Sequence, residues 1–204
     1  MSRLNLLAND QSYTFRSYFE MPYETDEILA EFGVTLKSRQ LLLPRSSVST
    51  DMVERIKTDL LETLEVVELA SETARREILV APVLTQIVRL SQSRLRIEYL
   101  LTVSNQLKGK LDYLIEGHHQ LLVIEAKNDD LSRGFTQLGV EMIALSRREP
   151  LQKIVYGAVT IGNVWLFGWL DADSQQIYRD ISLYLVPKDL QDVMEILMGI
   201  LTAS

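Results

Sequence analysis

LDYLIEGHHQLLVIEAK, residues 111–127, is the stretch of sequence that decides the fold. Its two short apolar runs, one on each side of the His-His pair, are typical of neighbouring β-strands. The second run is nearly continuous in apolar residues, as expected for a central strand that is covered on both faces. Asp112 stands in the first run, thirteen positions before Glu125, and Lys127 ends the second. Charged groups are rarely fully buried unless they are paired or bind a metal, so these three positions predict a functional site.

Helical and strand patterns alternate around this stretch. Helices are expected over 51–70, 71–91, 135–148 and 188–202, and Pro82 is expected to kink or restart the second of them. Strands are expected over 94–103, 111–117, 121–127, 153–162 and 164–172, with part of 177–186 extended. His118 and His119 are expected in a turn, and residues 128–134 in a loop. This order predicts an α/β fold in which helices flank a central mixed β-sheet.

The first 47 residues have a different character and are interpreted as an N-terminal extension to one domain, residues 48–204. Residues 13–21 mix aromatic and polar side chains and are expected to be extended. Residues 25–33 predict a short helix that begins near Thr25 and ends at Gly33. The boundary is expected in the Pro- and Ser-containing segment that follows.

Composition limits the class of protein. The chain has 204 residues, a formal net charge of −7 and no cysteine. The negative charge argues against a protein that coats nucleic acid, but not against a nuclease, whose cleft concentrates carboxylates. No apolar run is long enough for a membrane helix, so no membrane partner is expected. Without cysteine there is neither a disulfide nor a thiolate metal site, and the cytoplasm is the expected location.

Strand geometry brings the charged positions together. Side chains alternate between the two faces of a strand, so Glu125 and Lys127 are expected on the same face, with Asp112 beside them on the neighbouring strand. Two carboxylates this close repel each other unless a cation lies between them. Mg²⁺ prefers oxygen ligands, and a bound metal ion activates water for phosphodiester hydrolysis. Lys127 is expected to orient or help to deprotonate the attacking water.

The D…ExK pattern across two adjacent strands resembles the PD-(D/E)XK nuclease superfamily, which has the restriction-endonuclease-like fold. The resemblance covers roughly residues 70–172. It implies that Asp112 and Glu125 bind Mg²⁺, for which Mn²⁺ is expected to substitute, and that Lys127 assists the attack. Leu111 stands where the family usually has proline before the aspartate.

Two flanking helices extend this resemblance. SETARREILVAPVL, residues 71–84, is similar to the first helix of type I restriction enzyme nuclease domains, which carries an acidic residue of the site. Glu72 is the favoured candidate and Glu77 the rival; the two lie about 140° apart on a helical wheel, so they are not expected to face the site together. Gln137, ten residues after Lys127, resembles the family's helix residue that braces the site, and Glu141 shares its helix face.

The function expected from these residues is Mg²⁺-dependent hydrolysis of nucleic acid, with DNA as the expected partner; a homodimer is left open. Three alternatives stay open: a catalytically inactive binding or assembly module of the same fold, a hydrolase of another phosphodiester, and a structural ion-pair cluster. His118 and His119 are interpreted as a solvated turn. Trp165, Phe167 and Trp169 are interpreted as residues of the core or of a subunit interface rather than as a base-stacking platform.

Overall fold

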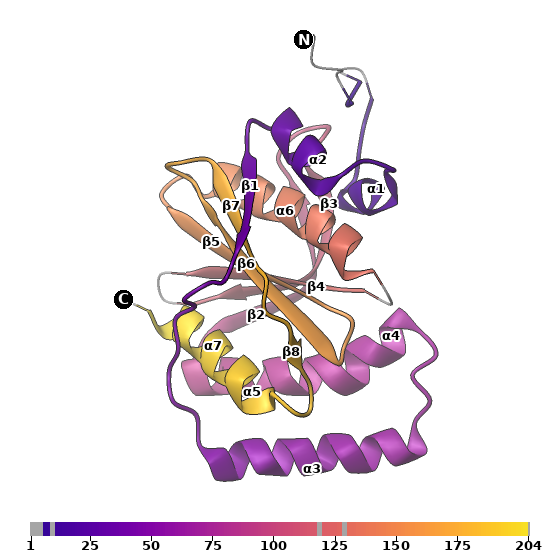
Figure 1. Cartoon of the computed structure of the whole chain (residues 1–204), viewed down its shortest axis with the longest axis vertical. Coiled ribbons are helices and arrows are strands. Elements are labelled where there is room, and N and C mark those ends of the chain that lie inside the picture. Colours follow the sequence, from indigo (N-terminus) through magenta and orange to yellow (C-terminus); the bar gives the residue numbers. More distant parts are fainter. Residues whose placement is uncertain (1–5, 9–10, 118–119, 128–129, 204) are drawn as a thin grey trace.

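The computed structural model describes residues 6–8, 11–117, 120–127 and 130–203. Its centre is an eight-stranded mixed sheet with helices against both faces, which confirms the predicted α/β arrangement (Figure 1). The turn predicted at His118 and His119 and the first part of the loop predicted at 128–134 lie outside the described residues.

The sheet has the strand order β1-β7-β6-β5-β4-β3-β2, with β8 paired to β6. Its strands are β1 (Thr35–Arg39), β2 (Arg94–Thr102), β3 (Lys108–Glu116), β4 (Leu121–Ala126), β5 (Ile154–Thr160), β6 (Val164–Asp171), β7 (Gln176–Asp180) and β8 (Tyr184–Leu185). β4 pairs with β3 antiparallel and with β5 parallel, and it lies inside the sheet. This position explains why its sequence is nearly continuous in apolar residues.

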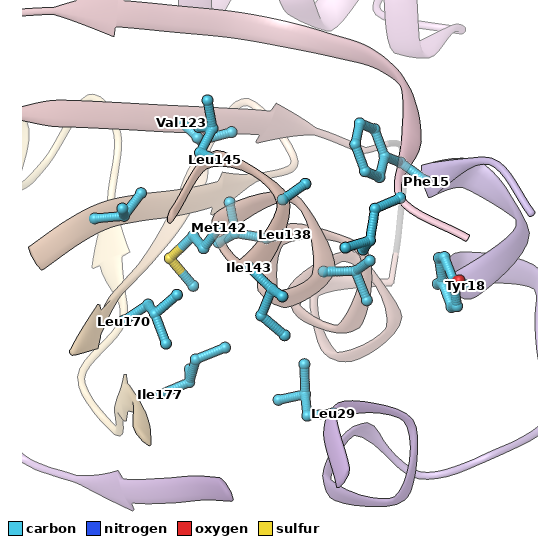
Figure 2. Close-up of a cluster of buried hydrophobic side chains, with 14 of the residues drawn as sticks. Phe15, Tyr18, Leu29, Val123, Leu138, Met142, Ile143, Leu145, Leu170 and Ile177 are labelled. Atoms are coloured by element: carbon cyan, nitrogen blue, oxygen red, sulfur yellow. The ribbon is translucent and has the colours of Figure 1, made fainter. Parts of the chain in front are cut away.

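The helices form two layers. They are α1 (Phe15–Glu20), α2 (Thr25–Glu31), α3 (Thr50–Val66), α4 (Glu72–Arg75), the π-helical turn η1 (Arg76–Val80), α5 (Ala81–Ser91), α6 (Leu131–Arg148) and α7 (Leu190–Thr202). Buried side chains of α1, α2 and α6 form one hydrophobic cluster with the sheet (Figure 2). Those of α3, η1, α5 and α7 form a second cluster with it. The described helices include none that is both long and apolar enough to cross a membrane.

Two predicted segments are helical instead. The extended segment predicted at 13–21 is wrong, because residues 15–20 form α1. The Thr14 N–H donates to Ser17 Oγ at 3.1 Å, and Phe15 and Tyr18, three residues apart, bury the same helix face. The loop predicted at 128–134 is wrong from Leu131 onward, because the Asp130 side chain caps the start of α6.

The N-terminal extension packs as part of the sheet and its core. β1 runs parallel to β7 and extends the sheet at that edge. Phe15, Tyr18 and Leu29 are buried against α6, which belongs to the remainder of the chain (Figure 2). The described part of residues 1–47 thus shares one sheet and one hydrophobic cluster with residues 48–204.

Pro82 shapes the helix that was predicted over 71–91. Proline has no N–H to bond the carbonyl four residues earlier, which is that of Ile78. The structure accommodates this with the π-helical turn η1, which directly precedes α5. π-Helical turns are rare in proteins, and those that occur are often found at functional sites. The first residue of η1 is Arg76, which reaches Asp112 in β3.

The side chains interpreted as core residues are confirmed as such. Trp165 and Phe167 are fully buried in the second hydrophobic cluster, and Trp169 is half-buried and packs against that cluster. The apolar stripe of α7 is also fully buried; it comprises Leu190, Val193, Met194, Leu197 and Leu201. Burial therefore makes Trp165 and Phe167 unavailable for base stacking, whereas Trp169 is half-buried.

Candidate active site

Glu125 and Lys127 come from the end of β4. The Lys127 N–H donates to the Thr160 carbonyl at 2.7 Å, which continues the pairing with β5 one residue past the strand. The two side chains lie on the same face, as strand alternation predicts, and Lys127 Nζ lies 2.6 Å from Glu125 Oε1. Only 2% of the Glu125 side chain and 8% of the Lys127 side chain are exposed, so this ion pair is almost completely removed from water.

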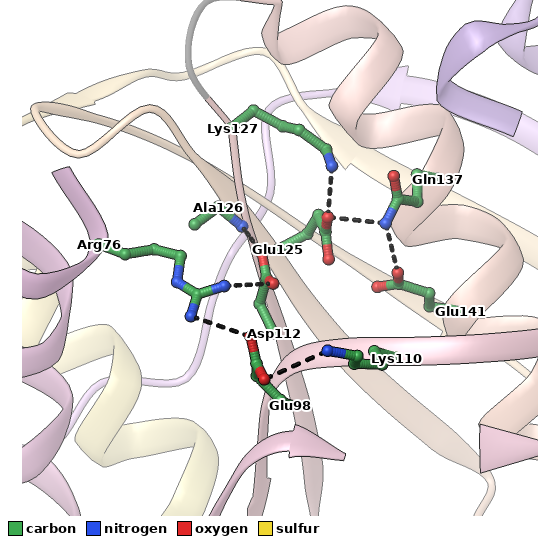
Figure 3. Close-up of polar contacts among 9 residues, drawn as sticks. All are labelled: Arg76, Glu98, Lys110, Asp112, Glu125, Ala126, Lys127, Gln137 and Glu141. Carbon is green, nitrogen blue, oxygen red and sulfur yellow. Dashed lines mark hydrogen bonds and ion pairs between the residues drawn. The ribbon is translucent and has the colours of Figure 1, made fainter. Parts of the chain in front are cut away.

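Asp112 lies beside this pair, in β3. The last paired position of β3 and β4 is Tyr113 opposite Ile124, and Asp112 is the next residue along β3. One carboxylate oxygen, Oδ2, accepts the Ala126 N–H at 3.0 Å. The other, Oδ1, accepts from Arg76 Nη1 at 2.9 Å (Figure 3). The predicted neighbourhood of Asp112 and Glu125 is therefore present in the structure.

Helix α6 supplies a polar bracket behind Glu125. Gln137 Nε2 donates to Glu125 Oε1 at 2.7 Å and to Glu141 Oε1 at 2.8 Å. Gln137 and Glu141 lie four residues apart on one helix face, and both are buried. The Gln137 amide thus links two carboxylates that would otherwise repel each other, and it fixes the orientation of Glu125 (Figure 3).

A cavity of about 550 Å³ opens over these residues. Its wall carries both cations and carboxylates. It is formed by Arg16, Glu72, Arg76, Glu98, Lys110, Asp112, Glu125 and Lys127 together with Thr14, Thr73, Leu100, Gly109 and Gln137. Glu72, the favoured helix acid, lines this cavity. Glu77 lines a different hollow, between α3 and α5. The structure therefore brings Glu72, and not Glu77, to the same cavity as the D…ExK residues.

Burial controls the protonation of the carboxylates. It raises the pKa of Glu125 to about 8, with a further contribution from Asp112 that opposes the effect of Lys127. Burial also raises the pKa of Glu141 well above its ordinary value, and the charge on Glu125 adds to the shift. Burial lowers the pKa of Lys127, but the Glu125 carboxylate outweighs it, so the net pKa is raised and the amine stays charged. A proton is therefore retained on the carboxylates behind the cavity near neutral pH.

The residues present fit a magnesium ion. Glu125 lines the cavity beside Asp112, and its buried Oε2 accepts no hydrogen bond from an N–H or hydroxyl donor among the described residues; this oxygen is left for a metal ion or for a proton shared with the neighbouring Glu141. Within the described residues, no three His, Cys, Asp or Glu side chains converge as a metal-binding group. Mg²⁺ does not need such a group, because it keeps several waters and is often held by one or two carboxylates. Asp112 and Glu125 would be those carboxylates.

Sequence reasoning did not identify several residues of the cavity. Arg76 and Glu98 were not assigned to the site, because their position depends on how η1 and β2 pack beside β3. The contribution of α1 was also missed: Arg16 lines the cavity, and the Phe19 ring lies 4.8 Å from Lys127 Nζ. No spacing in the sequence connects these residues with the D…ExK pattern. Tertiary packing brings them together: η1 and β2 pack beside β3, and α1 packs on α6.

Comparisons with known proteins provide no relative. No protein-family model, no curated protein and no solved structure matches this chain.

Proposed function

We propose that this chain is a Mg²⁺-dependent nuclease with a restriction-endonuclease-like core, which hydrolyses phosphodiester bonds of nucleic acid, with DNA as the proposed substrate. The observation that carries the proposal is the convergence of Asp112, Glu125 and Lys127 on one cavity. A structural ion-pair cluster has no need of an open cavity over its carboxylates.

Each residue has a defined role in this proposal. Asp112 and Glu125 would hold the ion, which supplies an activated water and charge stabilisation at the phosphate. Lys127 carries its proton on Nζ at the cavity wall, where it orients the attacking water and offsets negative charge as the new bond forms. Gln137 keeps Glu125 in place through its amide. Glu72 adds a further carboxylate to the cavity wall.

The local charge supports an anionic substrate. The whole chain carries a net charge of −7, yet the cavity wall holds as many cationic side chains as carboxylates. Binding of a divalent cation would make the wall net positive. A phosphodiester backbone would then be attracted to this cavity, although the rest of the protein repels it.

One observation favours a second candidate function, a catalytically inactive binding or assembly module. Asp112 already pairs with Arg76, and Glu125 already pairs with Lys127. Carboxylates neutralised in this way can persist without a metal ion. The feature that distinguishes this candidate from a nuclease is therefore whether a divalent ion binds at all.

Cleavage assays test the proposal. Labelled single-stranded, duplex and branched DNA would be incubated with the wild type, Lys127→Ala and Lys153→Ala in Mg²⁺ or in Mn²⁺. Lys153 is a matched control, because it forms an exposed ion pair with Asp173 away from the cavity. We expect cleavage by the wild type and the control, none in EDTA, and a loss of about 100-fold or more for Lys127→Ala. A wild type that cuts no substrate, or a Lys127→Ala variant that cuts equally well, contradicts the proposal.

A further inference from the structure

Arg76 is held unusually firmly for a residue beside a cavity. Its side chain is 13% exposed, its Nη1 lies 2.9 Å from Asp112 Oδ1, and its Nη2 lies 3.6 Å from Glu98 Oε1. Its Nε is buried and has no partner among the described residues. The guanidinium also lies over the ring of Tyr113, with Cζ 5.7 Å from the centroid. Arg76 therefore links η1 to β2 and β3 beside the candidate site, and its Nε–H is among the guanidinium donors that these two contacts leave unused.

Glu98, the second partner of Arg76, has a strained backbone. It lies in the middle of β2, between the pairs Ile97–Tyr113 and Tyr99–Leu111, and so stands opposite Asp112. Its φ is 50°, in the left-handed region that residues other than glycine rarely adopt. Such strain persists only where the surroundings impose it, and it is frequent at functional sites. Here it places the Glu98 carboxylate between Arg76 and Lys110 (Figure 3).

Because Arg76 already contacts Asp112, it competes with any cation for the Asp112 carboxylate. Asp112 Oδ2 accepts the Ala126 N–H, so Oδ1 is the oxygen turned toward Arg76. A guanidinium and a metal ion repel each other and cannot both contact that oxygen closely. We propose that Arg76 and a divalent cation compete for Asp112, and that Arg76, once off Asp112, binds a phosphate group of the nucleic acid. This inference rests on the proposed function.

Glu98 and the chemistry of arginine support the second half of the proposal. Because Nη2 keeps its contact with Glu98, the guanidinium stays at the cavity wall when Nη1 leaves Asp112. Its planar fork of donors matches two phosphate oxygens, which the single ammonium of lysine does not. Arg76 would therefore couple metal binding to substrate binding. The ion binds Asp112, and the N–H groups of Arg76 that this releases donate to the phosphate.

Metal binding without nucleic acid tests the first half. Calorimetry with Mn²⁺ alone would compare the wild type with Arg76→Gln, Arg76→Lys and the control Arg75→Gln. Arg75 precedes Arg76 and bonds the Ile161 carbonyl instead of Asp112. We expect Arg76→Gln to bind Mn²⁺ about tenfold more tightly than the wild type. The substitution removes the guanidinium that competes for Asp112, and the free energy of one charge-assisted hydrogen bond corresponds to about this factor. Arg76→Lys and Arg75→Gln should stay close to the wild type. An unchanged Mn²⁺ affinity for Arg76→Gln, in a variant that urea unfolding shows to be folded, overturns the competition.

Substrate binding tests the second half. The affinity for a short fluorescent DNA duplex would be measured with Ca²⁺ in place of Mg²⁺. We expect both Arg76→Gln and Arg76→Lys to bind at least about tenfold more weakly, because lysine cannot replace the bidentate contact. Equal affinity for Arg76→Lys and the wild type overturns the phosphate contact.

The two proposals fail in different ways. If neither the wild type nor Arg76→Gln binds Mn²⁺ or cuts DNA, the proposed function fails and this inference fails with it. If the wild type binds Mn²⁺ and cuts DNA, and Arg76→Gln equals it in both assays and in DNA affinity, only the role of Arg76 is refuted.

Discussion

Glu141 offers a test of the buried carboxylates that requires no substrate. Its side chain is fully buried on α6, and its described hydrogen bond comes from Gln137. Lys127 contacts Glu125 and not Glu141, so Glu141 is the carboxyl that keeps a proton most readily. Burial raises its pKa well above the ordinary value of 4.5. The substitution Glu141→Gln keeps an oxygen for Gln137 and removes the titration.

The direction of the pH dependence follows from these protons. Above about pH 4.5 the unfolded chain loses the Glu141 proton, whereas the native state keeps it until its own, higher pKa. The native state therefore binds more protons, and the free energy of unfolding falls as the pH rises. One retained proton lowers the free energy of unfolding by about 1.4 kcal/mol per pH unit, so the upper limit for Glu141 between about pH 5.5 and about pH 7.5 is about 3 kcal/mol. Glu141→Gln removes this loss.

Urea unfolding in EDTA would measure the effect at both pH values. We expect Glu141→Gln to gain up to about 3 kcal/mol relative to the wild type on going from the lower to the higher pH. Glu62→Gln is the control, because it makes the same change in net charge at an exposed position of α3. If Glu141→Gln differs from the wild type by the same amount at both pH values, Glu141 is ionised in the native state and the reasoning is refuted.

Further predictions concern packing and backbone geometry, and urea unfolding measures each of them. Phe15→Ala should destabilise the protein by about 3–5 kcal/mol, because Phe15 is 1% exposed and lies in the core cluster shared with α6; a loss below about 1 kcal/mol would show that the N-terminal residues do not belong to that core. Gly168→Ala should lower the free energy of unfolding by at least about 1–3 kcal/mol, because an added Cβ would lie 2.6 Å from the Tyr178 carbonyl oxygen. Gly33→Ala meets no neighbouring atom but has φ +80°, so only backbone strain of about 1 kcal/mol is expected. If Gly33→Ala costs as much as Gly168→Ala, steric crowding does not explain the Gly168 effect.

Short-range periodicity allowed part of the site to be predicted. Glu125 and Lys127 share a strand face because side chains alternate with a period of two. Gln137 and Glu141 share a helix face because they are four residues apart. Both relations hold in the structure, where the four side chains form one chain of contacts. Both relations depend only on the local geometry of a strand or a helix, so they do not depend on how these elements pack.

Relations that depend on tertiary packing could not be predicted. The sequence placed Glu72 and Glu77 on different helix faces but did not show which face meets the sheet, because that depends on how the helix packs. The π-helical turn that begins at Arg76 also changes the register after that point, which an ideal helical wheel ignores. The helix α1 was missed because its aromatic residues are stabilised by contact with α6, more than by helix propensity.

A crystal structure of the protein soaked in Mn²⁺ would test the central claim most directly, which is that Asp112 and Glu125 hold one divalent ion beside Lys127. The account predicts an anomalous peak between these two carboxylates, with Arg76 no longer on Asp112 Oδ1 and still close to Glu98. The absence of a peak there, with the Arg76–Asp112 and Lys127–Glu125 pairs intact at saturating Mn²⁺, would contradict the account and favour the binding module.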